Sequence, residues 1–227
     1  MSIASEWNIQ QKELKELIGK KETFDKAKDL YLSMHRNLHF SDNDNTLMDQ
    51  LWKMLDIKDF SIMPMVKDVT IAWNIWHITR IEDLTVNILL NNSEQIYNKE
   101  WKMKMNVSVN DTGNAMTDDE IIDLSKSIDI EALKEYRKAV GNQTQSIFSK
   151  LKFEDMKRKI ESKNIEKIVK EGGVTEHPDS IWLLDFWGRK NVAGIILMPG
   201  TRHQIGHLND CINIKEKIDK KKDYYKS

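Results

Sequence analysis

Cysteine is almost absent from the 227-residue sequence, and glycine and proline are scarce. The single cysteine, Cys211, excludes an internal disulfide and any cysteine-rich zinc module. Nine glycines and three prolines are too few for the many turns of a sheet protein, so an all-β fold is nearly excluded and long helices are favoured. A chain of this length can bury a sizeable core without disulfides or a structural metal. We therefore expect a reduced, cytoplasmic helical protein.

The sequence also lacks an excess of charge of either sign. Its 35 Lys+Arg and 36 Asp+Glu residues leave a net charge of -1, which gives no basic field for nucleic acid and no polybasic membrane signal. The N-terminus has no apolar leader. The longest apolar stretch, 70–90, carries His77, Arg80, Glu82 and Asp83, which a lipid-spanning helix would not tolerate. We expect neither a nucleic-acid partner nor a membrane location.

Common nucleotide-binding and hydrolase motifs are missing too. The sequence has no Walker A loop, no GxGxxG fingerprint, no GxSxG elbow and no HExxH pair. Nucleotide-binding and serine-hydrolase functions therefore have no support in the sequence.

Hydrophobic periodicity predicts helices along most of the chain. The segment 70–90 is apolar almost all round, which is typical of a helix at the centre of a bundle. Capping residues mark the starts of several helices, among them Thr46, Thr117, Asp129 and Thr201. The segment 191–198 fits a buried helix or a strand equally well. The predicted helices cover 9–40 with a break near Gly19, 47–55, 70–90, 117–127, 130–151, 153–170, 179–187 and 201–218.

These elements predict one all-α domain over 1–227, built on a four-helix bundle with additional short helices. The segment 70–90 is expected to face 201–218, because both have a long apolar surface. The ends 1–8 and 219–227 are polar and are expected to be loose. The segment 91–127 is expected to decorate the bundle as an insertion.

Two histidines of the last predicted helix have the spacing of a metal-binding pair. His203 and His207 lie four residues apart, so both imidazoles project from one helix face and can share one ion. His77 lies in the most apolar helix, and a ligand from a facing helix is how bundles build metal sites. Three histidines with open positions describe a catalytic site. The alternative is that each histidine is hydrogen-bonded in the core without a metal.

Charged residues near these histidines are candidates for supporting roles. Arg80, Glu82 and Asp83 lie in an apolar helix. Burying their charges is costly in free energy unless they pair or line a polar cavity. They therefore either support the site or form a structural salt-bridge network between helices. Asp210, three residues after His207, is placed to orient an imidazole.

The remaining histidines and the cysteine are weaker candidates for metal binding. His35 and His39 form a second pair with four-residue spacing, and we interpret them as stabilising a helix C-terminus, with metal binding as the alternative. Cys211 continues the line of His203 and His207 and is either a soft fourth ligand or, as we prefer, a small buried apolar residue. His177 precedes a proline and is interpreted as part of a surface loop.

Two stretches together resemble a known family. TIAWNIWHITRIED over 70–83 and TRHQIGHLN over 201–209 are similar to the DinB/YfiT-like superfamily of bacterial four-helix bundles. The resemblance implies an up-down-down-up bundle and a three-histidine site for a divalent metal, such as Zn, Ni, Mn or Fe. Carried over by motif, the ligands are His77, His203 and His207. Many members follow the second histidine of the last helix with a basic residue and a glutamine, whereas this chain has Leu208, Asn209 and Asp210.

The resemblance also implies functions and an assembly. Some members are S-transferases that use a low-molecular-weight thiol such as bacillithiol or mycothiol, others resemble metal-dependent hydrolases, and many are homodimers. The expected function is therefore metal-dependent transfer or hydrolysis on a small-molecule substrate. The alternative is a non-enzymatic stress-response or small-ligand-binding bundle whose histidine cluster is vestigial or structural.

Overall fold

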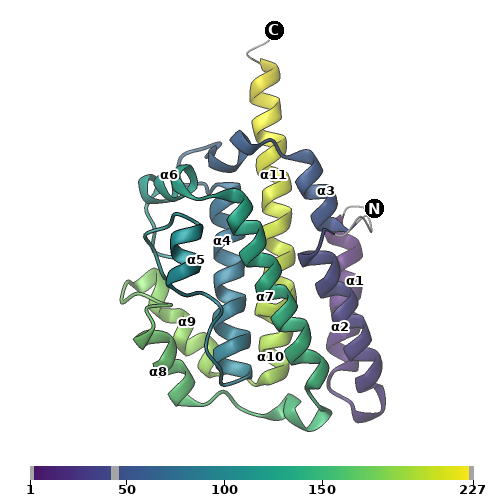
Figure 1. Ribbon diagram of the computed structural model, residues 1–227. Coiled ribbons are helices and arrows are strands. Elements are labelled where there is room, and N and C mark those ends of the chain that lie inside the picture. Colours follow the sequence, from purple (N-terminus) through teal and green to yellow (C-terminus); the bar gives the residue numbers. More distant parts are fainter. Residues whose placement is uncertain (1–2, 42–45, 225–227) are drawn as a thin grey trace.

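Four long helices form the centre of the molecule in the computed structural model, which describes residues 3–41 and 46–224. Over these residues the protein is helical and contains no strand. In Figure 1, α2 and α11 run upward while α4 and α7 run downward, which gives the expected up-down-down-up order. Their bounds are α2 (Phe24–His39), α4 (Ile71–Glu82), α7 (Ile130–Lys150) and α11 (His203–Tyr224).

Helix α4 is the axis of the core. It continues into a π-helical segment, η3 (Asp83–Leu90), and every residue of both is buried. Thr70 caps its N-terminus by accepting a hydrogen bond from the backbone N–H of Trp73. Its most extensive partner is α11, as the apolar surfaces of the two segments predict. A helix buried on all sides must satisfy each of its polar side chains internally, and its histidine and carboxylates do so in two separate clusters.

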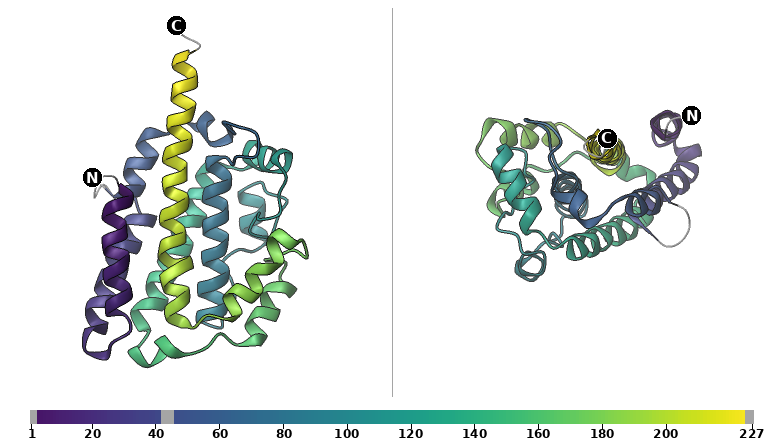
Figure 2. Two further views of the ribbon diagram at one scale, coloured as in Figure 1. Left: turned by 180° about the vertical axis from the view of Figure 1, so that it is seen from behind. Right: turned by 90° about the horizontal axis from the view of Figure 1, so that it is seen from above.

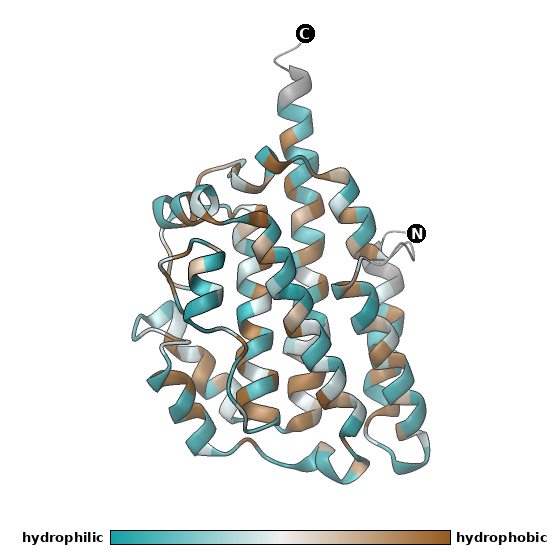
Figure 3. Cartoon of the chain, in the orientation of Figure 1, coloured by the Kyte–Doolittle hydropathy of each residue, from teal (hydrophilic) through white to brown (hydrophobic). Residues whose placement is uncertain are grey.

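The shorter helices flank this core. Figures 1 and 2 show α1 and α3 beside α2, and α5, α6, α8 and α9 on the opposite side of α4. Figure 3 shows mostly hydrophilic residues along α8, which lies at the outside of this group. The 3-10 helices are η1 (Lys21–Thr23), η2 (Ile57–Ser61) and η4 (Phe153–Lys157), and a second π-helical segment is η5 (Met198–Arg202). The other α-helices are α1 (Ile3–Leu17), α3 (Leu47–Met54), α5 (Lys99–Lys104), α6 (Asp118–Ser127), α8 (Ser162–Lys170), α9 (Pro178–Gly188) and α10 (Val192–Leu197).

Several predicted boundaries are confirmed by capping contacts. Thr46 and Thr117 form capping boxes at α3 and α6, and Asp129 accepts from the backbone N–H of Ala132 at the start of α7. The break near Gly19 separates α1 from α2. The ambiguous segment 191–198 is helical as α10, with a single bridge between Asn191 and Lys159.

Other predictions of local structure are wrong. The segment 153–170 is not one helix, because it is divided into η4, an extended link and α8. Thr201 does not cap the last helix, since it lies inside η5 and its hydroxyl donates to the carbonyl oxygen of Ile196. The expected loose ends are helical over 3–8 and from 219 to Tyr224, while residues 1–2 and 225–227 lie outside the described part. Among the described helices, none is both long and apolar enough to cross a bilayer.

Candidate metal centre

Helices α4 and α11 bring His77, His203 and His207 together. The centroids of the three imidazole rings lie 4.5 to 5.0 Å apart. Each ring offers a nitrogen within 4.8 Å of those of the other two. The pair predicted from helix spacing, His203 and His207, and the histidine predicted on the facing helix, His77, thus meet between α4 and α11.

Hydrogen bonds fix which nitrogen of His77 and of His207 faces this point. The Nδ1–H of His77 donates to the carbonyl oxygen of Thr112 at 2.7 Å, and the Nδ1–H of His207 donates to Oδ1 of Asn74 at 2.6 Å. With Nδ1 protonated, Nε2 of a neutral imidazole carries a lone pair. A donor bond from the far nitrogen is the usual support of a metal-binding histidine.

The spacing of the nitrogens fits a shared ion. Nε2 of His77 lies 3.2 Å from Nε2 of His203. Two nitrogens bound tetrahedrally at about 2.0–2.1 Å from one zinc ion would be about 3.3 Å apart. In addition, Nδ1 of His203 is buried and has no hydrogen-bond partner among the described residues. The donor set and its spacing therefore suit a divalent metal ion.

The three rings are neutral at physiological pH. Burial lowers the pKa of His77 to about 3, with a further contribution from His207, and it lowers the pKa of His207 to about 4. Burial, together with the neighbouring His77 and His207, also holds the pKa of His203 well below its usual value. Neutral imidazole is the form that binds a metal, so burial prepares these side chains as ligands.

A tight turn supplies the carbonyl that orients His77. The indole of Trp73 stacks on the His77 ring with 4.6 Å between centroids, and its Nε1–H donates to the carbonyl oxygen of Gly113. Gly113 has φ of 78°, and a Cβ there would lie 2.8 Å from Nε1 of Trp73. Glycine is therefore required for both the backbone conformation and the close approach. The turn places Thr112 against His77.

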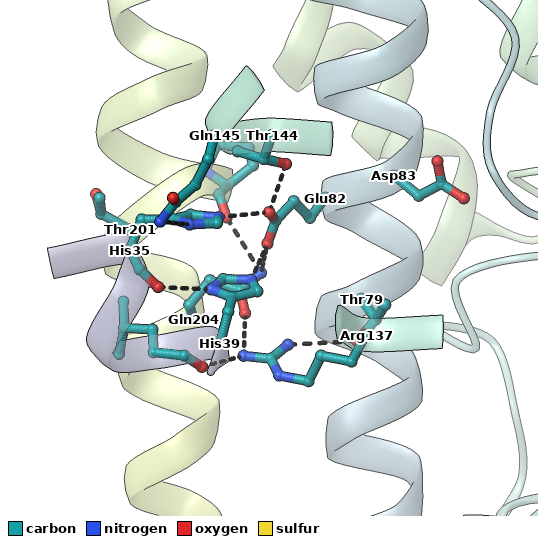
Figure 4. A network of polar contacts seen from close by, with 12 residues as sticks. His35, His39, Thr79, Glu82, Asp83, Arg137, Thr144, Gln145, Thr201 and Gln204 are labelled. Carbon is teal, nitrogen blue, oxygen red and sulfur yellow. Dashed lines mark hydrogen bonds and ion pairs between the residues drawn. The ribbon is translucent and has the colours of Figure 1, made fainter. Parts of the chain in front are cut away.

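The other histidine pair forms a second cluster, shown in Figure 4. His35 and His39 of α2 stack at 3.8 Å, and each donates through Nε2 to Glu82, at 2.8 and 2.6 Å respectively. Glu82 also accepts from the hydroxyl of Thr144 and the amide of Gln204. This cluster joins α2, α4, α7 and α11 in the middle of the core.

Charges inside the second cluster are balanced. Burial would raise the pKa of Glu82, but His39 and His35 hold it well below its usual range. Burial lowers the pKa of His39 to about 3 against the attraction of Glu82. Burial also lowers the pKa of Arg137 to about 10, which leaves it a cation at neutral pH. Gln204 connects the two charges, because it donates to Glu82 and accepts from Nη2 of Arg137.

Contact distances separate the two clusters chemically. The N–O distances of 2.6 and 2.8 Å at Glu82 are those of hydrogen bonds and are shorter than the separation of two ligands on one ion. The residue types at His35, His39 and Glu82 would suit a metal. Their ligand atoms are already occupied by protons and acceptors, so the second cluster does not fit an ion as it stands. Helix α2 ends at His39, as the C-terminus interpretation of this pair predicts, and both side chains are buried and donate to Glu82.

The structure places the other predicted site residues elsewhere. Arg80 forms an ion pair with Asp83 and a hydrogen bond to Tyr136, and Asp83 accepts from the backbone N–H groups of Ile96 and Tyr97. The salt-bridge alternative for this helix is therefore correct. Within the described part of the chain, Arg80, Glu82 and Asp83 make no hydrogen bond or ion pair to the three histidines.

Asp210 and Cys211 are also separate from the histidines. Asp210 lies at the surface. Its carboxyl group is still partly desolvated, and this desolvation together with the nearby Asp68 raises its pKa. Cys211 is fully buried and burial raises the pKa of its thiol, which fits the small apolar residue that we preferred. Within the described residues it belongs to neither cluster of candidate ligands. His177 lies on the surface at the N-cap of α9.

Three residues that sequence reasoning did not assign complete the site. Asn74 orients His207, Thr112 orients His77, and Gln204 attaches the start of α11 to Glu82. Asn74 had a visible signal, since it lies three residues before His77 on the same helix face. Thr112 acts through its backbone, so its side chain carries no signal.

Comparisons with known proteins agree with this description. The family model described as the DinB superfamily matches residues 45–210, which include all three histidines. The crystal structure of a conserved protein of locus from Enterococcus faecalis is similar, with a TM-score of 0.59 and 15% identity. That similarity covers 83% of this chain and 95% of the other, and at this identity it shows the fold alone. Among curated proteins, no match is found.

Proposed function

Because the chain belongs to the DinB superfamily and its three histidines meet at one point, we propose that it binds a divalent metal ion through His77, His203 and His207 and acts as a metal-dependent enzyme on a small molecule. The observation that carries the proposal is the direction of the Nε2 atoms. Thr112 and Asn74 hold two of the rings in the tautomer whose Nε2 faces the common point. A histidine cluster that was only packed into the core would also hydrogen-bond these Nδ1 atoms, but it would not need to bring a nitrogen of all three rings to one point.

The proposed chemistry follows from the ligand set. Three neutral nitrogens leave a divalent ion its full charge and open positions, which supplies Lewis-acid activation of a bound water or thiol. Imidazole nitrogens suit Zn, Ni and Fe among the candidate metals, and Mn is a candidate through the family resemblance. The two reaction classes that fit are transfer to a low-molecular-weight thiol of the bacillithiol type and hydrolysis. In both, this chain's own contribution is to orient the three imidazoles and to keep them unprotonated by burial.

Metal analysis tests the site directly. We expect tag-free wild-type protein to carry one equivalent of metal per chain, and His203→Ala to lose it, measured by elemental analysis. His177→Ala is the matched control, because this histidine is exposed on the surface and should leave the metal content unchanged. Equal metal content in wild type and His203→Ala would reject the site.

An activity screen tests the enzyme. Metal-loaded and metal-free protein are compared with electrophilic substrates, with and without added thiol, and with hydrolysable esters and amides. We expect turnover only in the metal-loaded form. If no metal supports turnover although the site is loaded, the alternative of a non-enzymatic ligand-binding bundle is favoured.

Assembly and location are further parts of the proposal. Family membership is the basis for a homodimer, and the low cysteine content is the basis for a cytoplasmic location. Light scattering coupled to size-exclusion chromatography measures the mass of the particle. A mass near 26.7 kDa would contradict the dimer.

A further inference from the structure

A small cavity adjoins the histidine cluster. His77 and His203 form part of its wall, and its volume is about 160 Å³. Half of the remaining lining residues come from α9, which lies beside α4 in Figures 1 and 2. A molecule seated in this cavity would therefore lie next to the proposed metal.

The wall of this cavity is apolar and carries no ionisable group besides the two histidines. Trp182, Leu183, Phe186 and Trp187 of α9 line it, and Asn114 is the other polar residue on the described wall. Oδ1 of Asn114 already accepts from the hydroxyl of Thr112. The Nε1–H of Trp182 donates to the carbonyl oxygen of Asp179 on its own helix, so Trp182 presents its ring to the cavity rather than a donor.

Cavity size limits the occupant. An apolar protein cavity of about 150 Å³ accommodates a benzene molecule. The cavity beside His77 thus has room for one six-membered ring or a branched alkyl group of similar volume. Trp182 and Phe186 meet edge to face, with 5.7 Å between centroids, and Trp182 is 49% exposed. A half-exposed tryptophan at the entrance of an apolar cavity is suited to contact an aromatic ligand.

Charge limits the occupant further. An ionised group in an apolar cavity pays a large desolvation cost unless an opposite charge meets it. The described wall offers no lysine, arginine, aspartate or glutamate. A carboxylate, phosphate or ammonium group would therefore be rejected from the apolar part of the cavity, and an anionic group would have to lie beside the proposed metal or outside the cavity.

We propose that this cavity binds the uncharged apolar part of the substrate, a single aromatic ring or a branched alkyl group, and directs the reacting polar atom toward His77 and His203. This proposal rests on the proposed function, which makes the cluster of His77, His203 and His207 the reaction centre. It adds the substrate class, which is a small neutral molecule with one compact apolar group.

Three probes that share a phenyl ring test this selectivity. Benzyl alcohol is neutral, benzenesulfonate is an anion that coordinates metals weakly, and benzylammonium is a cation without a free lone pair. Their binding to the purified protein is measured by ligand-observed NMR titration at pH 7. We expect benzyl alcohol to bind at least about tenfold more tightly than either charged probe. No binding of benzyl alcohol, or equal affinity for the three probes, would overturn the proposal.

Two matched variants locate the binding. Trp182→Ala should weaken benzyl alcohol binding roughly three- to tenfold, because it removes an aromatic wall. Ile181→Ala is the control, since Ile181 is the preceding residue of α9, is similarly exposed at 45%, and does not line the cavity. Equal effects of the two variants would overturn the location.

A third variant separates this proposal from the metal proposal. His207 is a proposed ligand but is not part of the cavity wall. His207→Ala should therefore lose metal and still bind benzyl alcohol within about twofold of wild type. Absence of ring binding in metal-loaded wild type contradicts the cavity proposal alone, whereas ring binding in wild-type protein that takes up no metal contradicts the proposed function alone.

Discussion

His35 and His39 on α2 and His203 and His207 on α11 have the same four-residue spacing, and each pair faces a residue of α4. At α2 that residue is Glu82, whose oxygens accept from both Nε2 atoms. At α11 it is His77, whose Nε2 faces that of His203 at 3.2 Å. The spacing of a pair brings two imidazoles together, but the third group decides whether their Nε2 atoms donate protons or face a common ion.

The two clusters are also mechanically connected. Gln204 follows His203 in the chain and donates to Glu82 and to the carbonyl oxygen of Ile78 on α4. These bonds fix the first turn of α11 against α4, which sets where His203 lies relative to His77. The cluster of His35, His39 and Glu82 thus stabilises the helices that position the cluster of His77, His203 and His207.

The largest expected effect is on stability, at Glu82. Glu82→Ala leaves the histidine donors without acceptors and Arg137 without a balancing charge, so we expect a loss of about 3–5 kcal/mol in the free energy of unfolding. His207→Ala leaves only Oδ1 of Asn74 without its donor and should cost about 1 kcal/mol in metal-free protein. Chemical denaturation of metal-free proteins measures both.

Glu82→Gln is the second variant to measure in case Glu82→Ala does not fold. It keeps the shape of the side chain but offers one acceptor oxygen instead of two, so its stability should lie between those of wild type and Glu82→Ala. Equal losses of stability in Glu82→Ala and His207→Ala would contradict the distinction between the two clusters. In that distinction, the cluster of His35, His39 and Glu82 is structural, and the cluster of His77, His203 and His207 is open to an ion.

A smaller effect is expected from the residue that orients His207. Asn74→Ala removes the acceptor of the His207 Nδ1–H, and loss of such support lowers metal affinity about 10- to 100-fold. Asn74→Asp keeps an acceptor oxygen and should bind metal at least as tightly as wild type. Competition with a chelator measures the affinities.

Thr85→Ala is the matched control for Asn74→Ala. Thr85 is also buried in the continuation of α4, but its hydroxyl bonds only to backbone carbonyls of its own helix and touches neither cluster. Similar losses of metal affinity in Thr85→Ala and Asn74→Ala would indicate a general effect of packing rather than of orientation.

The smallest effect, counted for one histidine over one pH unit, is a pH dependence of the free energy of unfolding. The pKa values of His77 and His207 are lowered to about 3 and about 4, whereas an unfolded histidine titrates near 6.5. Below pH 6.5 the unfolded state therefore binds more protons, so the stability of metal-free protein is fully present above that pH and falls as the pH decreases toward 4. The slope approaches about 1.4 kcal/mol per pH unit for each histidine.

Unfolding curves between pH 7 and pH 4 measure this slope. His207→Ala should reduce it, and His177→Ala, a surface substitution, should leave it unchanged. Stability that is independent of pH over this range would show that the three rings are not buried in their neutral form.

Much of the architecture follows from local signals. The capping residues Thr46, Thr117 and Asp129 act over a few residues, and the apolar surface of 70–90 has no stable place except the core. The boundaries that failed depend on distant packing. Residues 153–170 have helical composition throughout, but the link before α8 runs beside Asn191 and pairs Lys159 with it. Thr201 resembles a cap, but its hydroxyl bonds to a carbonyl inside η5 instead.

The sequence by itself determined the helical class, the order of the four long helices through the family resemblance, and the three histidines as a set. It did so because helix periodicity places residues four apart on one face, whatever surrounds them. Only the tertiary structure decided which histidine pair faces an acceptor and which faces another imidazole, and only it brought the carbonyl of Thr112 and the ring of Trp182 to the site. Those contacts join segments far apart in the chain, and a backbone carbonyl or a packed ring has no sequence pattern that announces its partner.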